Sequence, residues 1–197
     1  MRASDKVHLN WLEDLGSSDF SNQSVLDLGC GSGYVCQHAA SEGASAVVGV
    51  DILRPDIPSL GKTWNFRTLD LDSSDWSQDL TREGESFSRI LAFDIIEHLS
   101  SPWHFIQNCR DLLKEGGELI ITTPNTNSWE RLHNPNGWSG VTDQQHKTLF
   151  TPYSLEFLLK TGGFLEVETS APVNKLRFLG GMLPKIGGQI LCRASVG

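Results

Sequence analysis

A glycine-rich segment near the start of the chain contains residue types that can hold a small ligand. Its sequence, Asp27-Leu-Gly29-Cys-Gly31-Ser-Gly33, follows a short apolar run and precedes a segment with helical spacing. Glycines allow a tight turn and let a ligand approach backbone N–H groups closely. Asp51 ends the next apolar run, where an acidic side chain can accept hydrogen bonds from both hydroxyls of a ribose. Together the two features predict a site for a ligand that contains a nucleoside.

The spacing of the glycines separates two classes of nucleotide site. Dinucleotide-binding loops carry G-x-G-x-x-G, and here Tyr34 occupies the position of the third glycine. Asp27 would repel a pyrophosphate, whereas it would suit a ligand that carries an ammonium group. An NAD-binding protein is therefore the less favoured interpretation, and a glycine turn without any cofactor is a further alternative.

Asp94, Glu97 and His98 form a second cluster of reactive side chains, directly after the fourth apolar run. In a helical turn, positions i, i+3 and i+4 share a face, so two carboxylates and an imidazole would point the same way. Such a cluster is costly unless it holds a metal, holds a proton or faces water. Three interpretations stay open: a metal site that anchors an acceptor hydroxyl, a metal-free site with a general base, and a purely structural role.

The elements that must position these residues are indicated by short apolar runs along the chain. These runs predict strands at 24–30, 46–52, 64–71, 87–93, 118–123, 165–169 and 189–193. Helical segments are expected at 33–42, 102–114 and 152–161, the last two with Ser101 and Thr151 as N-caps. The pattern predicts an α/β fold: a Rossmann-like, seven-stranded, mostly parallel sheet with helices on both faces and the last strand antiparallel. Functional residues should follow strands one, two, four and five, because ligands bind at the carboxyl ends of such strands.

On these motifs the chain resembles the class I methyltransferases that depend on S-adenosylmethionine (SAM). VLDLGCGSG is similar to their first motif, VVGVDI to the second, and RTLDLD to the segment that reaches the adenine. The resemblance implies that SAM is the cofactor. It implies one set of binding residues: Asp27, Gly29, Gly31 and Gly33 for the methionine part, Asp51 for the ribose, and Ile52, Asp70 and Leu71 for the adenine. Because the resemblance covers nearly the whole chain, residues 1–197 are expected to form a single domain.

Further motifs narrow the resemblance to one branch of this family. IIEHL, TTPN and DQQHKTLFTPYSLEFLLKTGGF are similar to a branch that includes ubiquinone-pathway O-methyltransferases. That group and the small-RNA 2′-O-methyltransferases carry an E-x-x-E-H motif bound to a divalent metal, and the RNA group adds a later histidine. The resemblance therefore implies a metal such as Mg on Asp94, Glu97, His98 and His146. Asp94 departs from the motif, because it is one methylene shorter than glutamate. Without a metal, Glu97, His98 or His146 would act as the general base.

Two long connections have their own predictions. Residues 125–150 are expected to form a substrate lid, whose Trp129, Trp138 and Phe150 either wall a pocket or pack the loop onto the domain. Residues 172–188 join the last two strands and are basic and apolar. We favour a packed or partner-covered connection over contact with a membrane surface or an acidic substrate.

Composition limits the location and the partners of the chain. Its 197 residues include 16 Lys+Arg and 24 Asp+Glu, and the formal net charge of −8 disfavours a nucleic-acid substrate. We expect a cytoplasmic protein, since no membrane span or secretory signal is evident and the four cysteines form no CxxC pair. The expected activity is methyl transfer from SAM to an oxygen of a small molecule. The alternative is a SAM-binding regulatory or interaction module without catalysis.

Overall fold

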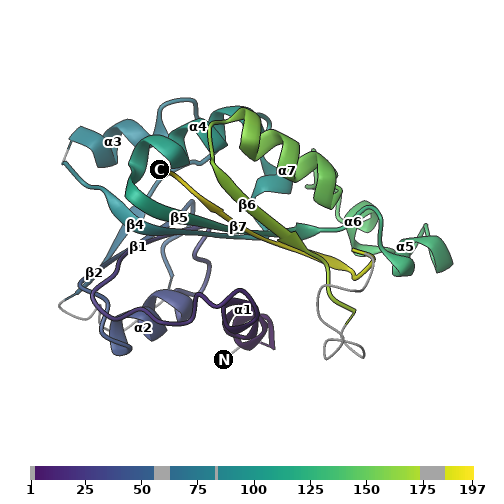
Figure 1. The fold of residues 1–197 in the computed structure, drawn as a ribbon, viewed down its shortest axis with the longest axis horizontal. Helices are drawn as coiled ribbons and strands as arrows, with labels where there is room; N and C mark the ends of the chain where they lie inside the picture. Colours follow the sequence, from purple (N-terminus) through teal and green to yellow (C-terminus); the bar gives the residue numbers. More distant parts are fainter. Residues whose placement is uncertain (1–2, 56–62, 83, 174–184) are drawn as a thin grey trace.

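A seven-stranded sheet forms the centre of the computed structural model, which describes residues 3–55, 63–82, 84–173 and 185–197 (Figure 1). The strands are β1 (Ser24–Leu28), β2 (Ala46–Asp51), β3 (Trp64–Thr68), β4 (Phe87–Phe93), β5 (Leu113–Pro124), β6 (Glu166–Ser170) and β7 (Gln189–Ser195). Their order in the sheet is β3-β2-β1-β4-β5-β7-β6. β7 is antiparallel to β5 and β6, and the other neighbours are parallel. The predicted fold class is confirmed, including the antiparallel last strand.

Helices cover both faces of this sheet (Figure 1). They are α1 (Ala3–Asp14), α2 (Tyr34–Ser41), α3 (Trp76–Arg82), α4 (Pro102–Leu112) and α7 (Pro152–Thr161), with three short turns, η1 (Ile96–His98), α5 (Trp129–His133) and α6 (Ser139–Thr142). Figure 1 shows α1 and α2 on one face, and α3, α4 and α7 on the other. Each face of the sheet has its own apolar core. Leu12 of α1 and Val35 of α2 are buried in one core, and Leu80 of α3, Phe105 of α4 and Leu155 of α7 are buried in the other. No helix in the described ranges has the length and apolar character needed to cross a membrane.

The starts of α4 and α7 follow from local capping chemistry. The Ser101 hydroxyl accepts a hydrogen bond from the His104 N–H at 3.4 Å, and Thr151 forms a reciprocal capping box with Ser154. In each case a proline follows the cap, where its missing N–H is not needed. Both predicted N-caps are confirmed.

The region between α4 and β5 differs from the sequence prediction. The helix ends at Leu112, and β5 begins at Leu113, five residues earlier than the expected strand at position 118. Gly116 has a φ of 69°, and a Cβ at Gly117 would lie 2.8 Å from the Lys114 carbonyl oxygen. The two glycines therefore shape an irregular stretch of the strand rather than a loop that ends the helix. Of the predicted connection 172–188, residues 174–184 lie outside the described part of the chain.

Candidate active site

The loop between β1 and α2 has the backbone shape that its glycines predict. Gly29, Gly31 and Gly33 have φ angles of 75°, 51° and 70°, a region that is strained for residues with a Cβ. A Cβ at position 29 would lie 3.2 Å from the side chain of Ile95. The loop therefore packs tightly against the segment that follows β4, and the two segments are positioned together.

Backbone N–H groups of this loop are already bonded within the protein. Four of them donate to protein acceptors at 2.8 to 3.0 Å, namely those of Gly29, Cys30, Gly31 and Gly33. The glycine-rich sequence predicts that a ligand approaches such N–H groups. In the structure these four groups already donate to protein acceptors, so they are not free for a ligand. Because free N–H groups are what binds phosphate at such loops, the arrangement disfavours a pyrophosphate ligand.

A cavity of about 270 Å³ opens beside the loop, at the carboxyl ends of β1, β2 and β3. Five of the eight predicted cofactor-binding residues line it: Gly29, Asp51, Ile52, Asp70 and Leu71. Asp27, Gly31 and Gly33 are not among its lining residues. The wall also includes residues that sequence reasoning had not assigned to the cofactor: Leu69, Asp72, Ile95, His98, Leu99 and Lys147.

Asp51 and Ile52 occupy the end of β2 in different ways. The Oδ2 atom of Asp51 accepts the Gly31 N–H at 2.8 Å, and Oδ1 accepts the Leu53 N–H at 3.2 Å. Each carboxylate oxygen retains a further lone pair, so a fixed Asp51 can still accept from a diol. Ile52 is 62% exposed, which leaves an apolar surface free to pack on a planar ring.

Asp27 differs from these residues because it is buried beneath the loop. It is 3% exposed, and the Cys36 thiol donates to its Oδ2 atom at 3.2 Å. Burial raises the pKa of Asp27 to about 6, although the bond from Cys36 and the charge of His8 oppose this. A positive charge placed nearby would favour the ionised carboxylate. The predicted contact with an ammonium group is therefore coupled to loss of a proton.

The cluster after β4 is built on a tight turn. Asp94 has a φ of 50°, and η1 covers only Ile96–His98. The Asp94 carboxylate accepts hydrogen bonds from the Thr122 hydroxyl at 3.2 Å and from the Gln189 amide. The structure therefore differs from the expected helical face that Asp94 would share with Glu97 and His98.

Glu97, His98 and His146 do come together. Their potential ligand atoms lie within 4.8 Å of one another, and the two imidazole centroids are 4.7 Å apart. The N–H groups of Lys147 and Thr148 donate to the Glu97 carbonyl at 2.8 and 3.1 Å. These two bonds hold the segment with His146 against η1, so that distant parts of the sequence form one group.

Glu97 is almost fully enclosed in this group. It is 1% exposed, and its Oε2 atom accepts a hydrogen bond from the Thr123 hydroxyl at 2.9 Å. Burial raises the pKa of Glu97 to about 8, with a further contribution from the charges of Asp94 and Asp143. At neutral pH the side chain is therefore mostly protonated, and it can donate a proton or a hydrogen bond.

The hydrogen bonds of His146 define which ring nitrogen can react. Its Nδ1 atom lies 3.1 Å from the Gly140 carbonyl, which can only accept, so Nδ1 carries the proton in the neutral ring. The Nε2 atom then has a free lone pair and lies 3.7 Å from Asp143 Oδ2. His98 has a buried Nδ1 without a hydrogen-bond partner among the described residues. The lone pair of His146 Nε2 is therefore available for binding or proton transfer.

The three grouped side chains fit a metal ion in donor type. Two imidazoles and one carboxylate suit Mn²⁺ or Zn²⁺ better than Mg²⁺, which prefers oxygen ligands. The bond that the Thr123 hydroxyl donates to Glu97 and the bond that His146 Nδ1 donates to the Gly140 carbonyl are outer contacts that orient such ligands. Asp94, the fourth predicted ligand, lies outside this group.

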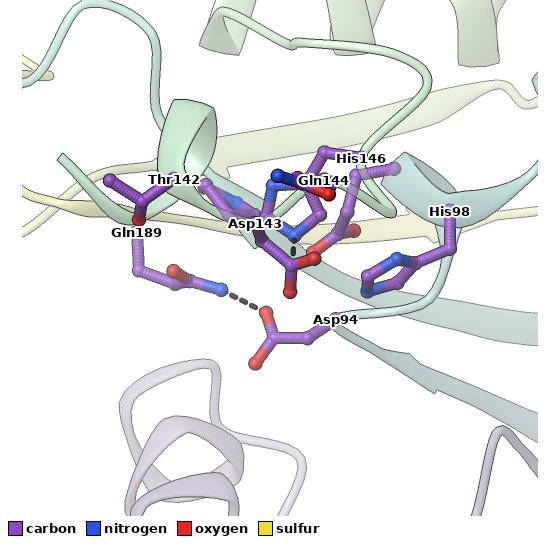
Figure 2. A pocket seen from close by; sticks show the side chains of 9 residues that line it. Asp94, His98, Thr142, Asp143, Gln144, His146 and Gln189 are labelled. Carbon is purple, nitrogen blue, oxygen red and sulfur yellow. Dashed lines mark hydrogen bonds and ion pairs between the residues drawn. The ribbon is translucent and has the colours of Figure 1, made fainter. Parts of the chain in front are cut away.

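A second cavity, of about 650 Å³, lies over the group (Figure 2). It is lined by Asp94, Glu97, His98, Pro124, Thr142, Asp143, Gln144, His146 and Gln189. His98 lines both cavities, so they meet at this side chain. Gln189 is a neutral amide at the start of β7, and nothing in the sequence marks it as a site residue. Its pairing with Pro124 in the structure places it beside the carboxyl end of β5.

The aromatic residues of the long connection do not line this cavity. Trp138 and Phe150 are each 4% exposed, whereas Trp129 is 57% exposed and contacts the His133 ring. For Trp138 and Phe150 the structure favours packing of the connection onto the domain, which was one of the two predicted roles.

Comparison with known sequences gives a family and several relatives. A family model described as a methyltransferase domain matches residues 2–169. A ubiquinone biosynthesis O-methyltransferase of Cereibacter sphaeroides is 34% identical over 110 residues, which cover 55% of this chain and 44% of that protein. A tRNA U34 carboxymethyltransferase of Alcanivorax borkumensis is 33% identical over 111 residues, covering 54% of this chain and 34% of that protein. In these alignments the chain spans less than half of the length of the relatives.

Solved structures support the same fold. A SAM-dependent methyltransferase from Archaeoglobus fulgidus has a TM-score of 0.72 at 19% identity, and the match covers 97% of this chain and 94% of the other. The shared architecture agrees with the strand order of the sheet. Since the family model covers most of the sequence, this chain belongs to the methyltransferase-domain family.

Proposed function

We propose that the chain is a SAM-dependent methyltransferase and that its acceptor is an oxygen atom of a small molecule. The observation that carries this proposal is the meeting of two cavities at His98, one suited to a nucleoside and one lined by acid–base groups. Methyl transfer requires donor and acceptor in line and in contact. A SAM-binding module without catalysis would need only the first cavity.

Residues of the first cavity fit SAM in shape and in charge. Asp51 is positioned to accept from ribose hydroxyls, Ile52 to pack on the adenine, and Asp70 to accept from the adenine amino group. Asp27, behind the glycine loop, favours a positive charge, which the methionine part of SAM carries. When bound, SAM supplies an electrophilic methyl group on a sulfonium ion.

His146 is the base that we propose for an oxygen acceptor. A hydroxyl must lose its proton as it is methylated, and the Nε2 atom of His146 has the free lone pair to take it. The carboxylate of Asp143, 3.7 Å from Nε2, would stabilise the resulting imidazolium. Proton transfer of this kind contributes roughly 10²- to 10⁴-fold in rate. Glu97, whose pKa burial raises to about 8, would be mostly protonated at neutral pH and would donate a hydrogen bond.

A metal ion held by Glu97, His98 and His146 is the second candidate for activating the same hydroxyl. The grouping of their donor atoms within 4.8 Å favours it. Such an ion would supply Lewis acidity that lowers the pKa of the hydroxyl. The two candidates differ in what His146 does, because a ligand nitrogen cannot also accept the proton.

Direct binding and turnover measurements test the proposal. SAM and NAD are titrated calorimetrically, and pools of hydroxylated small molecules, amines, thiols and nucleosides are screened for release of S-adenosylhomocysteine. SAM binding with release from a hydroxylated pool supports the proposal, and the O-methyltransferase named above is a reason to expect it. SAM binding without release from any pool favours the non-catalytic module. Binding of NAD in preference to SAM overturns the proposal.

A further inference from the structure

The residues that line the second cavity indicate the chemical class of the acceptor. This inference rests on the proposed function. Of the nine lining residues, Pro124 is the one apolar side chain. Three are carboxylic acids, and the described part of the chain contributes no Lys or Arg to the wall. A long apolar substituent would displace water from these polar groups without replacing its hydrogen bonds. The wall is therefore poorly suited to a lipid-tailed acceptor.

Two of the acids approach the cavity from different elements. Asp94 follows β4, and Asp143 follows α6. Figure 2 shows their carboxylates turned toward the same space, with the Gln189 amide on one side and the His98 imidazole on the other. Both carboxylates therefore line the space that a ligand would occupy (Figure 2).

The partners of these acids among the described residues are neutral groups and histidine imidazoles. Asp94 is bonded to the neutral groups of Thr122 and Gln189, and its Oδ2 atom lies 3.7 Å from His8 Nε2. Asp143 Oδ1 accepts the Gln145 N–H at 2.9 Å, its Oδ2 atom lies 3.7 Å from His146 Nε2, and its side chain is 47% exposed. Neither acid pairs with a Lys or Arg among the residues that the structure describes. A phosphate or carboxylate ligand would therefore be repelled, whereas a cation would be attracted.

From this geometry we propose that the acceptor is a small hydroxylated amine, of the class of amino sugars and amino alcohols. Its ammonium group contacts Asp94 and Asp143, and one hydroxyl lies at His146. As the hydroxyl oxygen bonds to the methyl carbon, its proton passes to His146 Nε2. The bond between that carbon and the sulfonium sulfur breaks, and its electron pair stays on sulfur. The products are a methyl ether, S-adenosylhomocysteine and a protonated His146.

Binding of matched probes to the full chain saturated with S-adenosylhomocysteine tests the acceptor class. Calorimetry compares glucosamine with glucose, glucose 6-phosphate and a short alkyl catechol, which differ in charge or in apolar surface. We expect glucosamine to bind about tenfold more tightly than glucose, and the phosphate and the catechol to bind less tightly than glucose. Tighter binding of the phosphate or the catechol, or no preference for the amine, overturns the proposal.

Charge-neutral variants test whether the two acids cause this preference. D94N and D143N should each weaken glucosamine binding about tenfold and change glucose binding less than twofold. Asparagine tolerates the left-handed backbone at position 94, so D94N preserves the turn. D111N, which removes an exposed acid on α4, is the control and should change neither. Equal glucosamine affinity in all three variants overturns the proposal.

The failure of this inference is distinguishable from failure of the proposed function. SAM binding to the free chain is measured separately, and release of S-adenosylhomocysteine is compared between hydroxylated amines and simple phenols. A chain that binds no SAM overturns the proposed function and this inference with it. A chain that binds SAM and methylates phenols but not hydroxylated amines overturns only the acceptor class.

Discussion

Lys147 and Asp72 form an ion pair in the wall of the first cavity, with 2.6 Å between Lys147 Nζ and Asp72 Oδ2. Asp72 also accepts from the N–H and the hydroxyl of Ser100, at 2.6 and 2.7 Å. The bond from Lys147 is the largest cause that lowers the pKa of Asp72 to about 2. Both members of the pair line the first cavity, and the adjacent His146 lines the second. The pair therefore fixes the acceptor side of the site relative to the cofactor side.

Replacement of Lys147 by Met should impair catalysis more than stability. The pair is partly exposed, with 49% and 29% of the two side chains accessible, so its loss should cost about 0.5 kcal/mol of unfolding free energy. Loss of alignment at His146 should lower kcat/KM about tenfold. Steady-state kinetics and urea unfolding measure the two effects.

K160M is the matched control for this variant. Lys160 pairs with Glu156 at 2.7 Å on the exposed side of α7, away from both cavities. It should share the small loss of stability and keep wild-type kinetics. If both variants retain full kcat/KM, the positioning role of Lys147 is wrong.

The fold and the cofactor cavity could be predicted because local patterns encode them. Each central strand is a mostly apolar run, as in β1, whose five residues are all buried. Gly29 and Asp51 directly follow or end such strands. The parallel sheet therefore brings Gly29 and Asp51 to the same edge, whatever path the chain takes between the two strands.

The acceptor side could be predicted only in part, because it depends on the path of the long connection. His146 reaches His98 through two backbone bonds to the Glu97 carbonyl, which any residue types could make. Its position was suggested by family resemblance and not by spacing. For Asp94 the spacing is misleading. It predicts a helical face shared with Glu97 and His98, whereas the positive φ of Asp94 places it in a turn.

Asp51 should be the residue on which SAM affinity depends most. D51A removes the acceptor for the ribose hydroxyls and also the partner of the Gly31 N–H. Hydrogen bonds to a charged group contribute about 1.5 to 3 kcal/mol, so calorimetry should show affinity about 10- to 100-fold lower. D51N, which keeps one acceptor oxygen, should be intermediate. SAM affinity equal to that of the surface variant D111A would contradict the ribose contact.

SAM affinity should decrease as pH falls below about 6. Burial raises the pKa of Asp27 to about 6, and the ammonium group of SAM would favour its ionised form. Above this pH the carboxylate is already ionised, and below it binding must release a proton, which costs up to about tenfold in affinity per pH unit. Titrations between pH 5 and 8 should show this slope in the wild type and not in D27N. Methylthioadenosine, which lacks the ammonium group, is the control ligand, and an equal slope for it would show that Asp27 is not the cause.

Chelation and H146A should separate the two ways of activating the acceptor hydroxyl. If Glu97, His98 and His146 hold a metal, EDTA should abolish turnover while SAM affinity stays within twofold, and added Mn²⁺ should restore turnover. If His146 is the base, EDTA should have no effect, and H146A should lower kcat roughly 10²-fold or more with little change in SAM affinity. Full activity of H146A in the presence of EDTA would contradict both roles.

The stability of the apo chain should fall as pH rises from 6.5 to 8, because of Glu97. Its pKa is about 8 in the folded chain against 4.5 for the free side chain, so the unfolded chain is ionised in this range while the folded chain keeps the proton. The raised pKa therefore stabilises the fold at low pH, and this contribution is lost as pH rises toward 8. The expected loss is about 2 kcal/mol of unfolding free energy over this interval.

Glutamine at position 97 should remove this pH dependence. E97Q has no proton to lose, so its unfolding free energy in urea should stay nearly constant between pH 6.5 and 8. Asp27, with a pKa of about 6, titrates mainly below this interval and does not obscure the comparison. Mn²⁺ that binds the ionised Glu97 should reduce the slope in the wild type and leave E97Q unchanged. If the unfolding free energies of the wild type and E97Q change in parallel with pH in the absence of metal, Glu97 is ionised in the folded chain at pH 6.5.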